Sequence, residues 1–93
     1  MDCRFSELRR KDVINTCTGN RVGRVCDCLL DLRSGQIVAL IVPGPARFLG
    51  WFGREDDYVL PWACITRIGR DVILIDGKGD IRRDRRPKWD AFA

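Results

Sequence analysis

The hydrophobic pattern of this chain consists of short alternating segments. Residues 21–32 carry apolar side chains at most even positions and charged side chains mainly at odd positions. Alternation with a period of two predicts a long strand with one buried and one solvated face. Val25 and Leu29 break the alternation on the solvated side, and Gly23 indicates a bulge or a bend within the strand.

Residues 36–42 form the most strand-like run of the chain. Every position after Gln36 is apolar, so we expect this strand to be covered on both faces or to take part in a homodimer contact. The turn at 33–35, in which Gly35 suits a left-handed backbone, predicts an antiparallel hairpin with the preceding strand. Pro43 ends the strand because proline cannot donate a backbone hydrogen bond.

The remaining predicted elements are short. They are a helical turn at residues 5–10, a strand at 13–14, a strand at 57–60, and a hairpin of strands 65–68 and 72–75. In the helical turn, Phe5 and Leu8 would face the core. About six short strands linked by Gly/Pro turns predict an all-β fold. A small six-stranded barrel is favoured because closure removes exposed strand edges.

Length and composition narrow the class of protein. Ninety-three residues are enough for one small domain. The longest wholly apolar run, residues 37–42, is far shorter than the roughly 20 residues of a membrane-spanning helix. The charged N-terminus lacks the apolar core of a secretory signal. We therefore expect a cytoplasmic protein without a membrane span.

The basic charge is concentrated at the C-terminus. Residues 77–93 carry six basic and three acidic side chains, which account for three of the four net positive charges. We therefore divide the chain into a domain at residues 1–76 and a loosely ordered basic tail at 77–93. Arginine pairs with phosphate and tryptophan stacks on bases, so the tail is the candidate nucleic-acid site. The alternative is a solvated tail, because acidic residues interrupt the basic ones. The candidate residues are Arg82, Arg83, Arg85, Arg86, Lys88 and Trp89.

The loop between the predicted strands at 36–42 and 57–60 is rich in aromatic residues. Residues 47–54 hold three of the eight aromatic side chains of the chain, with an arginine at each end. Aromatic anchors rimmed by arginine are typical of the centre of a protein–protein interface. The alternative is that this loop folds over the sheet and caps the core. The candidate partner-binding residues are Arg47, Phe48, Leu49, Trp51, Phe52 and Arg54.

The residue types needed for catalysis or for a metal site are scarce. The chain contains no histidine, which excludes Ser-His, Cys-His and His-metal arrangements. The acidic run at residues 55–57 is best interpreted as a solvated loop. Cys26 and Cys28 could hold a soft metal if both pointed the same way from a strand, but a structural zinc site needs four ligands. We expect two reduced, buried thiols, no metal, no cofactor and no enzymatic activity.

Three stretches of the chain carry a family resemblance. They are FSELRRKDVINTCTGNRVGRVCDCLLDLRSGQIVALIVPG, RFLGWFGREDDYVLPW and ITRIGRDVILID. Over about residues 4–76 the chain resembles the PRC-barrel superfamily, named for the cytoplasmic barrel of the photosynthetic reaction-centre H subunit. It looks like the short stand-alone form that spore-forming bacteria carry as a sporulation protein. The resemblance implies a six-stranded barrel-like fold and a binding or scaffolding role toward protein partners, without a known enzymatic activity.

Two hypotheses for function follow from different parts of the chain. The first is a non-enzymatic, sporulation-associated adaptor that recognises a protein partner, or a second copy of itself, through residues 47–54. The alternative is an RNA- or ribosome-associated factor that uses the basic tail. A related example is the ribosome-maturation factor whose PRC-like domain contacts a ribosomal protein. A redox or metal role of Cys26 and Cys28 is a third possibility.

Overall fold

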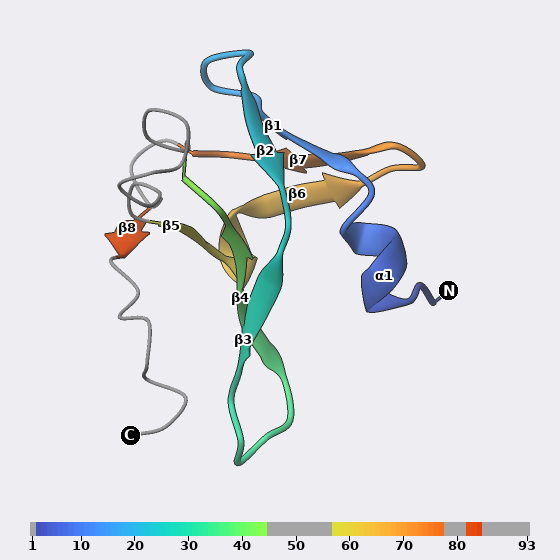
Figure 1. The fold of residues 1–93 in the computed structure, drawn as a ribbon, viewed down its shortest axis with the longest axis vertical. Helices are drawn as coiled ribbons and strands as arrows, with labels where there is room; N and C mark the ends of the chain where they lie inside the picture. The colour runs from blue at the N-terminus through green and yellow to red at the C-terminus, as the bar shows by residue number, and fades with distance from the viewer. Residues whose placement is uncertain (1, 45–56, 78–81, 85–93) are drawn as a thin grey trace, which may run out of the picture.

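The computed structural model describes the backbone of residues 2–44, 57–77 and 82–84, and the side chains of the first two of these ranges. The described residues form eight strands and one α-helical turn, grouped in two sheets (Figure 1). The elements are α1 (Phe5–Leu8), β1 (Asp12–Asn15), β2 (Arg21–Arg24), β3 (Asp27–Leu30), β4 (Ile37–Val42), β5 (Asp57–Pro61), the 3-10 turn η2 (Trp62–Cys64), β6 (Ile65–Ile68), β7 (Val72–Ile75) and β8 (Arg82–Asp84).

The two sheets each contain four strands. One has the order β2-β1-β7-β6 and the other the order β3-β4-β5-β8. β1 and β7 run parallel, whereas all other paired strands are antiparallel. The expected mostly β fold with an N-terminal helical turn is confirmed. The closed six-stranded barrel is wrong, because the described part of the chain has eight strands in two sheets that do not close on themselves.

The core is divided into two clusters that lie on opposite faces of β4. The main cluster is built from both sheets and α1; its buried members are Leu8, Val13, Val25, Leu40, Val42, Leu60, Cys64, Ile73 and Ile75. The second cluster consists of Ala39, Ile41 and Val59, with Cys26 packed against it. Since Leu40 and Val42 belong to the first cluster and Ala39 and Ile41 to the second, the expectation of coverage on both faces is confirmed for residues 39–42, whereas Val38 is 50% exposed.

The predicted long strand at residues 21–32 is divided between the two sheets. β2 ends at Arg24 and β3 begins at Asp27. Gly23 has a positive φ of 145°, and the register between β1 and β2 shifts at this point, so the predicted bulge is confirmed. A Cβ atom on Gly23 would lie 2.8 Å from Cγ1 of Val42. Glycine therefore allows the end of β2 to pass close to β4, where the chain changes sheets.

The bend also changes which side chains face the core. Val22, Val25 and Cys28 pack in or against the main cluster, so successive core positions are three residues apart. Val25, which interrupts the alternation in the sequence, is only 2% exposed. The expected buried face of even-numbered residues is therefore wrong in part: Val22, Cys26 and Cys28 pack against the core, but Leu30 and Leu32 are exposed. A period-two pattern fails here because the segment is not one continuous strand.

The parallel pair β1 and β7 is fastened beyond its ends by side chains. Asn15 is buried, and its Oδ1 accepts hydrogen bonds from the backbone N–H groups of Cys17 (3.0 Å) and Gly77 (3.1 Å). The hydroxyl and the backbone N–H of Thr16 both donate to the carbonyl of Ile75 at 2.9 Å. These bonds join the turn after β1 to the chain that leaves β7.

Candidate functional site

The predicted aromatic site falls outside the described residues. This applies to all six of its members, namely Arg47, Phe48, Leu49, Trp51, Phe52 and Arg54. Whether they cap the core or bind a partner therefore stays a prediction. The described structure locates the points from which this segment leaves and returns, at the end of β4 and the start of β5.

The predicted nucleic-acid site is described only in part. Arg85, Arg86, Lys88 and Trp89 lie outside the described residues, as do the side chains of Arg82 and Arg83. The backbone of residues 82–84 forms β8 and pairs antiparallel with β5. At least this portion of the expected loose tail is therefore a strand of the second sheet.

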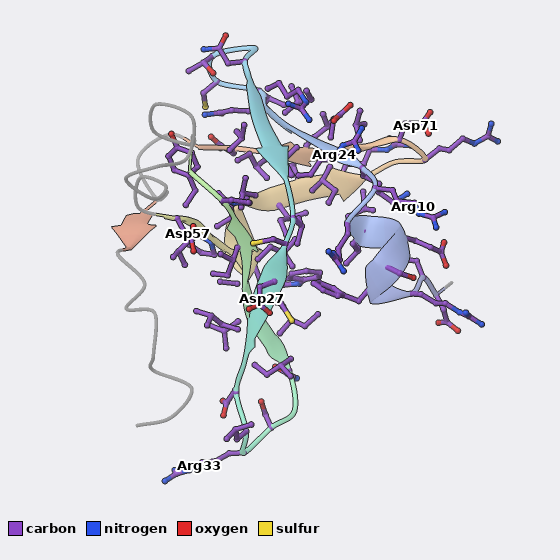
Figure 2. All side chains as sticks on the ribbon, in the orientation of Figure 1. Arg10, Arg24, Asp27, Arg33, Asp57 and Asp71 are labelled. Carbon is purple, nitrogen blue, oxygen red and sulfur yellow. The ribbon has the colours of Figure 1, made fainter. Side chains whose placement is uncertain are left out.

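The most prominent described surface is the hairpin arm, which we define as residues 29–38. Figure 1 shows the β3–β4 hairpin extending away from the other strands, and Arg33 lies at its tip (Figure 2). The arm exposes four large apolar side chains. They are Leu29, Leu30, Leu32 and Val38, with Leu32 92% and Leu30 53% exposed. The hydrophobic pattern placed Leu29 on the solvated side, but it assigned Leu30 and Leu32 to the buried face and Val38 to a covered strand.

The turn of the hairpin arm is held by its own hydrogen bonds. The N–H of Asp31 donates to the carbonyl of Gln36 at 2.9 Å, and the N–H of Gly35 donates to the carbonyl of Asp31 at 2.7 Å. The carboxylate of Asp31 also accepts from the N–H of Arg33 at 2.9 Å. Gly35 has a φ of 76°, as its predicted left-handed position requires. The exposed leucines are thus displayed by a preorganised turn.

One edge of the hairpin arm also presents backbone hydrogen-bonding groups. β3 is the terminal strand of its sheet and pairs only with β4 among the described strands. An open strand edge offers N–H and C=O groups to an extended segment of another chain. Single exposed apolar residues are common on protein surfaces, but four within one ten-residue hairpin beside an open edge are typical of an interaction site.

A pair of ion contacts organises the surface beside α1. The Nε atoms of Arg21 and Arg24 lie 2.9 Å and 3.3 Å from Oδ1 of Asp12, between β1 and β2. The hydrogen bond from Arg21 and then that from Arg24 lower the pKa of Asp12 below its ordinary value of 3.8. The carboxylate is therefore charged at neutral pH. It neutralises part of the arginine charge on this surface.

The structure changes the interpretation of the two closely spaced cysteines. Cys28 packs against the main cluster, whereas Cys26 packs against the second cluster. The premise that both thiols point the same way from one strand is wrong, because Cys26 lies in the bend before β3. Within the described residues, no group of three or more potential His, Cys, Asp or Glu ligands is positioned to hold a metal ion.

The interpretation of the acidic run at residues 55–57 also changes in part. Asp57 begins β5 and is only 5% exposed, so its interpretation as a solvated loop residue is wrong. The other two members of the run lie outside the described residues. Burial of a carboxylate at the start of a strand has no signal in the hydrophobic pattern.

A pocket of about 430 Å³ lies where the turn after β1 meets β2 and β5. Its described lining offers amides, a hydroxyl, a guanidinium and a phenol, from Asn15, Thr18, Asn20, Arg21, Val22, Pro43 and Tyr58. These groups can form hydrogen bonds with a ligand. Among them no carboxylate or thiol accompanies the phenol as an acid–base partner.

None of the helices in the described ranges has the length and apolar character required to cross a membrane. The comparisons with known proteins agree on one family. The PRC-barrel domain family matches residues 2–82.

The chain is similar to three curated proteins of spore-forming bacteria. It is 41% identical over 71 residues to the probable sporulation protein YlmC of Bacillus subtilis, which covers 76% of this chain and 88% of the relative. It is 33% identical over 73 residues to an uncharacterized protein of Clostridium acetobutylicum, covering 78% of this chain and 83% of the relative. It is also 33% identical over 78 residues to the uncharacterized protein YmxH of B. subtilis, covering 78% and 87%.

Proposed function

Because the chain belongs to the PRC-barrel family, we propose that it is a non-enzymatic protein-interaction module that acts in the cytoplasm during sporulation. The sporulation role is supported by its relative YlmC, which is named a probable sporulation protein. The interaction role is supported by the hairpin arm, whose apolar side chains are exposed on a turn with its own hydrogen bonds. The absence of histidine from the sequence supports the non-enzymatic assignment.

The observation that carries the proposal is the exposure of leucine at the tip of a preorganised arm. Burying a leucine or valine side chain completely is worth about 1.5–3 kcal/mol. Leu30 and Leu32 already hold a defined backbone geometry, so a partner would lose little additional entropy by ordering them. A partner strand could also pair with the open edge of β3.

The aromatic segment would extend this surface if its side chains project. Its composition of three aromatic residues with flanking arginines is that of an interface centre. This second contact area remains a prediction and is not needed for the first. The described residues offer no observation that favours the alternative RNA-binding role of the C-terminal tail.

A site-specific photo-crosslinker tests the interaction role in sporulating cells of a spore-forming bacterium. Leu32 is replaced by p-benzoylphenylalanine, the cells are irradiated, and adducts of the tagged chain are separated by mass. We expect a discrete protein adduct, with a second copy of the chain as one outcome that identifies the partner. The matched control places the same probe at Arg70, another exposed turn position. No adduct from Leu32, or the same adducts from both positions, would contradict the proposal.

The role in sporulation is tested with substitutions at the same surface. A strain that carries Leu30→Lys and Leu32→Lys should form fewer heat-resistant spores, because two charges disrupt an apolar contact. Spore counts are compared with those of a strain carrying Arg67→Ala and Arg70→Ala, two exposed positions outside the arm, with equal protein levels verified by immunoblot. Equal spore counts in the two strains would show that the exposed leucines are not required for sporulation.

A further inference from the structure

A second concave surface lies on the side of the molecule that carries α1. It is a groove of about 500 Å³, and it joins three segments that are distant in the sequence: α1 with the residues after it, the bend after β2, and the end of β4. Figure 2 labels Arg10 and Arg24, two of its basic residues. Its described lining consists of Ser6, Arg9, Arg10, Arg24, Val25, Cys26 and Pro43.

The arginines of this groove have unused donors. Arg9 and Arg10 are exposed, and within the described residues their side chains form no hydrogen bond or ion pair. Arg24 contacts Asp12 through Nε at 3.3 Å. A guanidinium carries five N–H donors in a planar fork, so most of those on Arg24 remain available. Such forks bind carboxylates in two-pronged fashion.

Apolar groups line the groove between the arginines. Pro43 and Cys26 are partly exposed and contribute apolar surface, whereas Val25 beneath them is almost completely buried. A ligand that fits must therefore present negative groups around an apolar one. Several arginines beside an apolar depression also match the composition of protein–protein contact sites.

We propose that this groove binds an acidic segment of a partner protein, in which aspartate or glutamate residues flank an apolar side chain. The carboxylates pair with Arg9, Arg10 and Arg24, and the apolar side chain covers Pro43 and Cys26. The groove shares no residue with the hairpin arm, so this proposal stands or fails separately from the arm.

A nucleic acid fits the groove less well. Single strands bind along tracks of positive charge with aromatic side chains for base stacking, and the described lining of the groove contains no aromatic residue. The charged carboxylate of Asp12, which contacts Arg24, would repel a phosphate backbone. Carboxylates on a flexible peptide can be spaced to avoid it.

Fluorescence anisotropy of labelled peptides tests the proposal with the full-length chain. The probe is the peptide GDELDEG, and the comparison peptides are GNQLNQG, which lacks the charges, and GDESDEG, which lacks the apolar side chain. We expect saturable binding of the probe below about 1 mM, with weaker binding of both comparison peptides. No binding of the probe in this range, or equal binding of all three peptides, would overturn the proposal.

Paired arginine variants locate the binding site. Arg9→Gln with Arg10→Gln removes two of the three charge-assisted contacts and should weaken binding of the probe at least about tenfold. The matched control, Arg33→Gln with Arg70→Gln, removes the same charge from exposed turns outside the groove and should leave the affinity unchanged. Equal weakening by both pairs would show that the peptide is held by general electrostatic attraction, and it would contradict the assignment of the groove as the binding site.

An oligonucleotide distinguishes the two classes of ligand. Labelled eight-nucleotide thymidine DNA and RNA of matching length are titrated against the same variants. We expect the oligonucleotides to bind weakly. Arg9→Gln with Arg10→Gln should weaken this binding no more than the control pair does. Tighter binding of an oligonucleotide than of the peptide, lost in this variant, would assign the groove to nucleic acid and overturn the protein-partner assignment. Circular dichroism verifies that both double variants remain folded.

Discussion

Two of the hairpins formed by consecutive strands, β6–β7 and β3–β4, differ in how they are attached to the rest of the molecule. The β6–β7 hairpin is fastened at its turn, because Nζ of Lys11 donates to the carbonyls of Gly69 and Arg70 at 2.6 Å each. Within the described part of the chain, the hydrogen bonds of the β3–β4 turn, in contrast, join residues of that hairpin to one another. The turn at 69–71 is polar, whereas the other displays Leu32. One hairpin completes the fold, and the other extends from it.

The largest expected difference between the hairpins is in their contribution to stability. Ile73 in β7 is fully buried in the main cluster. Ile73→Ala should lower the free energy of unfolding by about 2–5 kcal/mol through lost burial and a remaining cavity. Leu32→Ala should change it by less than about 0.5 kcal/mol, as at other exposed positions. Urea unfolding followed by circular dichroism measures both; similar losses would show that the arm contributes to the core and would remove the contrast.

A smaller effect should follow from releasing the fastened turn. Lys11→Met removes the two hydrogen bonds from Nζ and should cost about 1 kcal/mol of unfolding free energy. The amide of Gly69, which donates to the carbonyl of Val72 at 2.8 Å, should exchange its hydrogen faster. The amide of Gly35 in the other hairpin serves as the internal control. Unchanged exchange at Gly69 would mean that Lys11 does not restrain this turn.

The smallest expected effect concerns the pKa of Asp12, a carboxylate on the surface beside β2. The hydrogen bonds from Arg21 and Arg24 lower the pKa of Asp12 below 3.8. The stabilising contribution of this carboxylate is therefore present above its unfolded-state pKa and is lost as the pH falls through the lower folded-state value. Carboxyl carbon NMR should show Asp12 titrating below pH 3.8 in the native chain.

Removing the first arginine should raise this titration midpoint. Arg21→Gln deletes the largest cause of the shift, so the pKa of Asp12 should move upward toward 3.8. Arg33→Gln, at the tip of the hairpin arm, should leave it unchanged. A native midpoint at or above the ordinary value would contradict the ion-pair geometry between β1 and β2.

Local features of the fold could be predicted from the sequence. The hairpin of strands 65–68 and 72–75 has the predicted bounds, because both strands and their glycine-containing turn are contiguous. Gly35 occupies the expected left-handed turn position. The continuous apolar run of β4 correctly indicated coverage on two faces for residues 39–42. In the hairpin and the turn the deciding interactions lie within a few residues of one another, whereas the coverage of β4 was indicated by its continuous apolar composition alone.

The remaining features depend on contacts between distant segments. Pairing of β1 with β7 joins Asp12 to Val72, and no periodicity in either strand specifies that partner. The division of residues 21–32 between two sheets had only two local signs, Gly23 and the misplaced Val25. Eight strands were thus counted as six, partly because one strand was in fact two. A period-two pattern cannot show such a division when both parts remain extended.

The candidate surfaces were equally difficult to foresee. The hairpin arm is exposed because its leucines extend beyond the body, and composition alone assigns leucine to the core. The arginine groove is assembled from α1, the bend after β2 and the end of β4, so Arg9, Arg24 and Pro43 become neighbours only after folding. In the linear sequence the groove arginines do not stand out from the other basic residues.

The parallel pairing of β1 with β7 has a consequence for synthesis of the chain. β1 is synthesised well before its neighbour at 72–75 emerges from the ribosome. The β3–β4 hairpin, whose partners are adjacent in sequence, can form long before that moment. Nascent chains should therefore display the leucines of residues 29–38 while Val13 still lacks its β7 neighbour. During this interval the growing polypeptide is exposed to premature association, and a chaperone or the cognate partner could protect it.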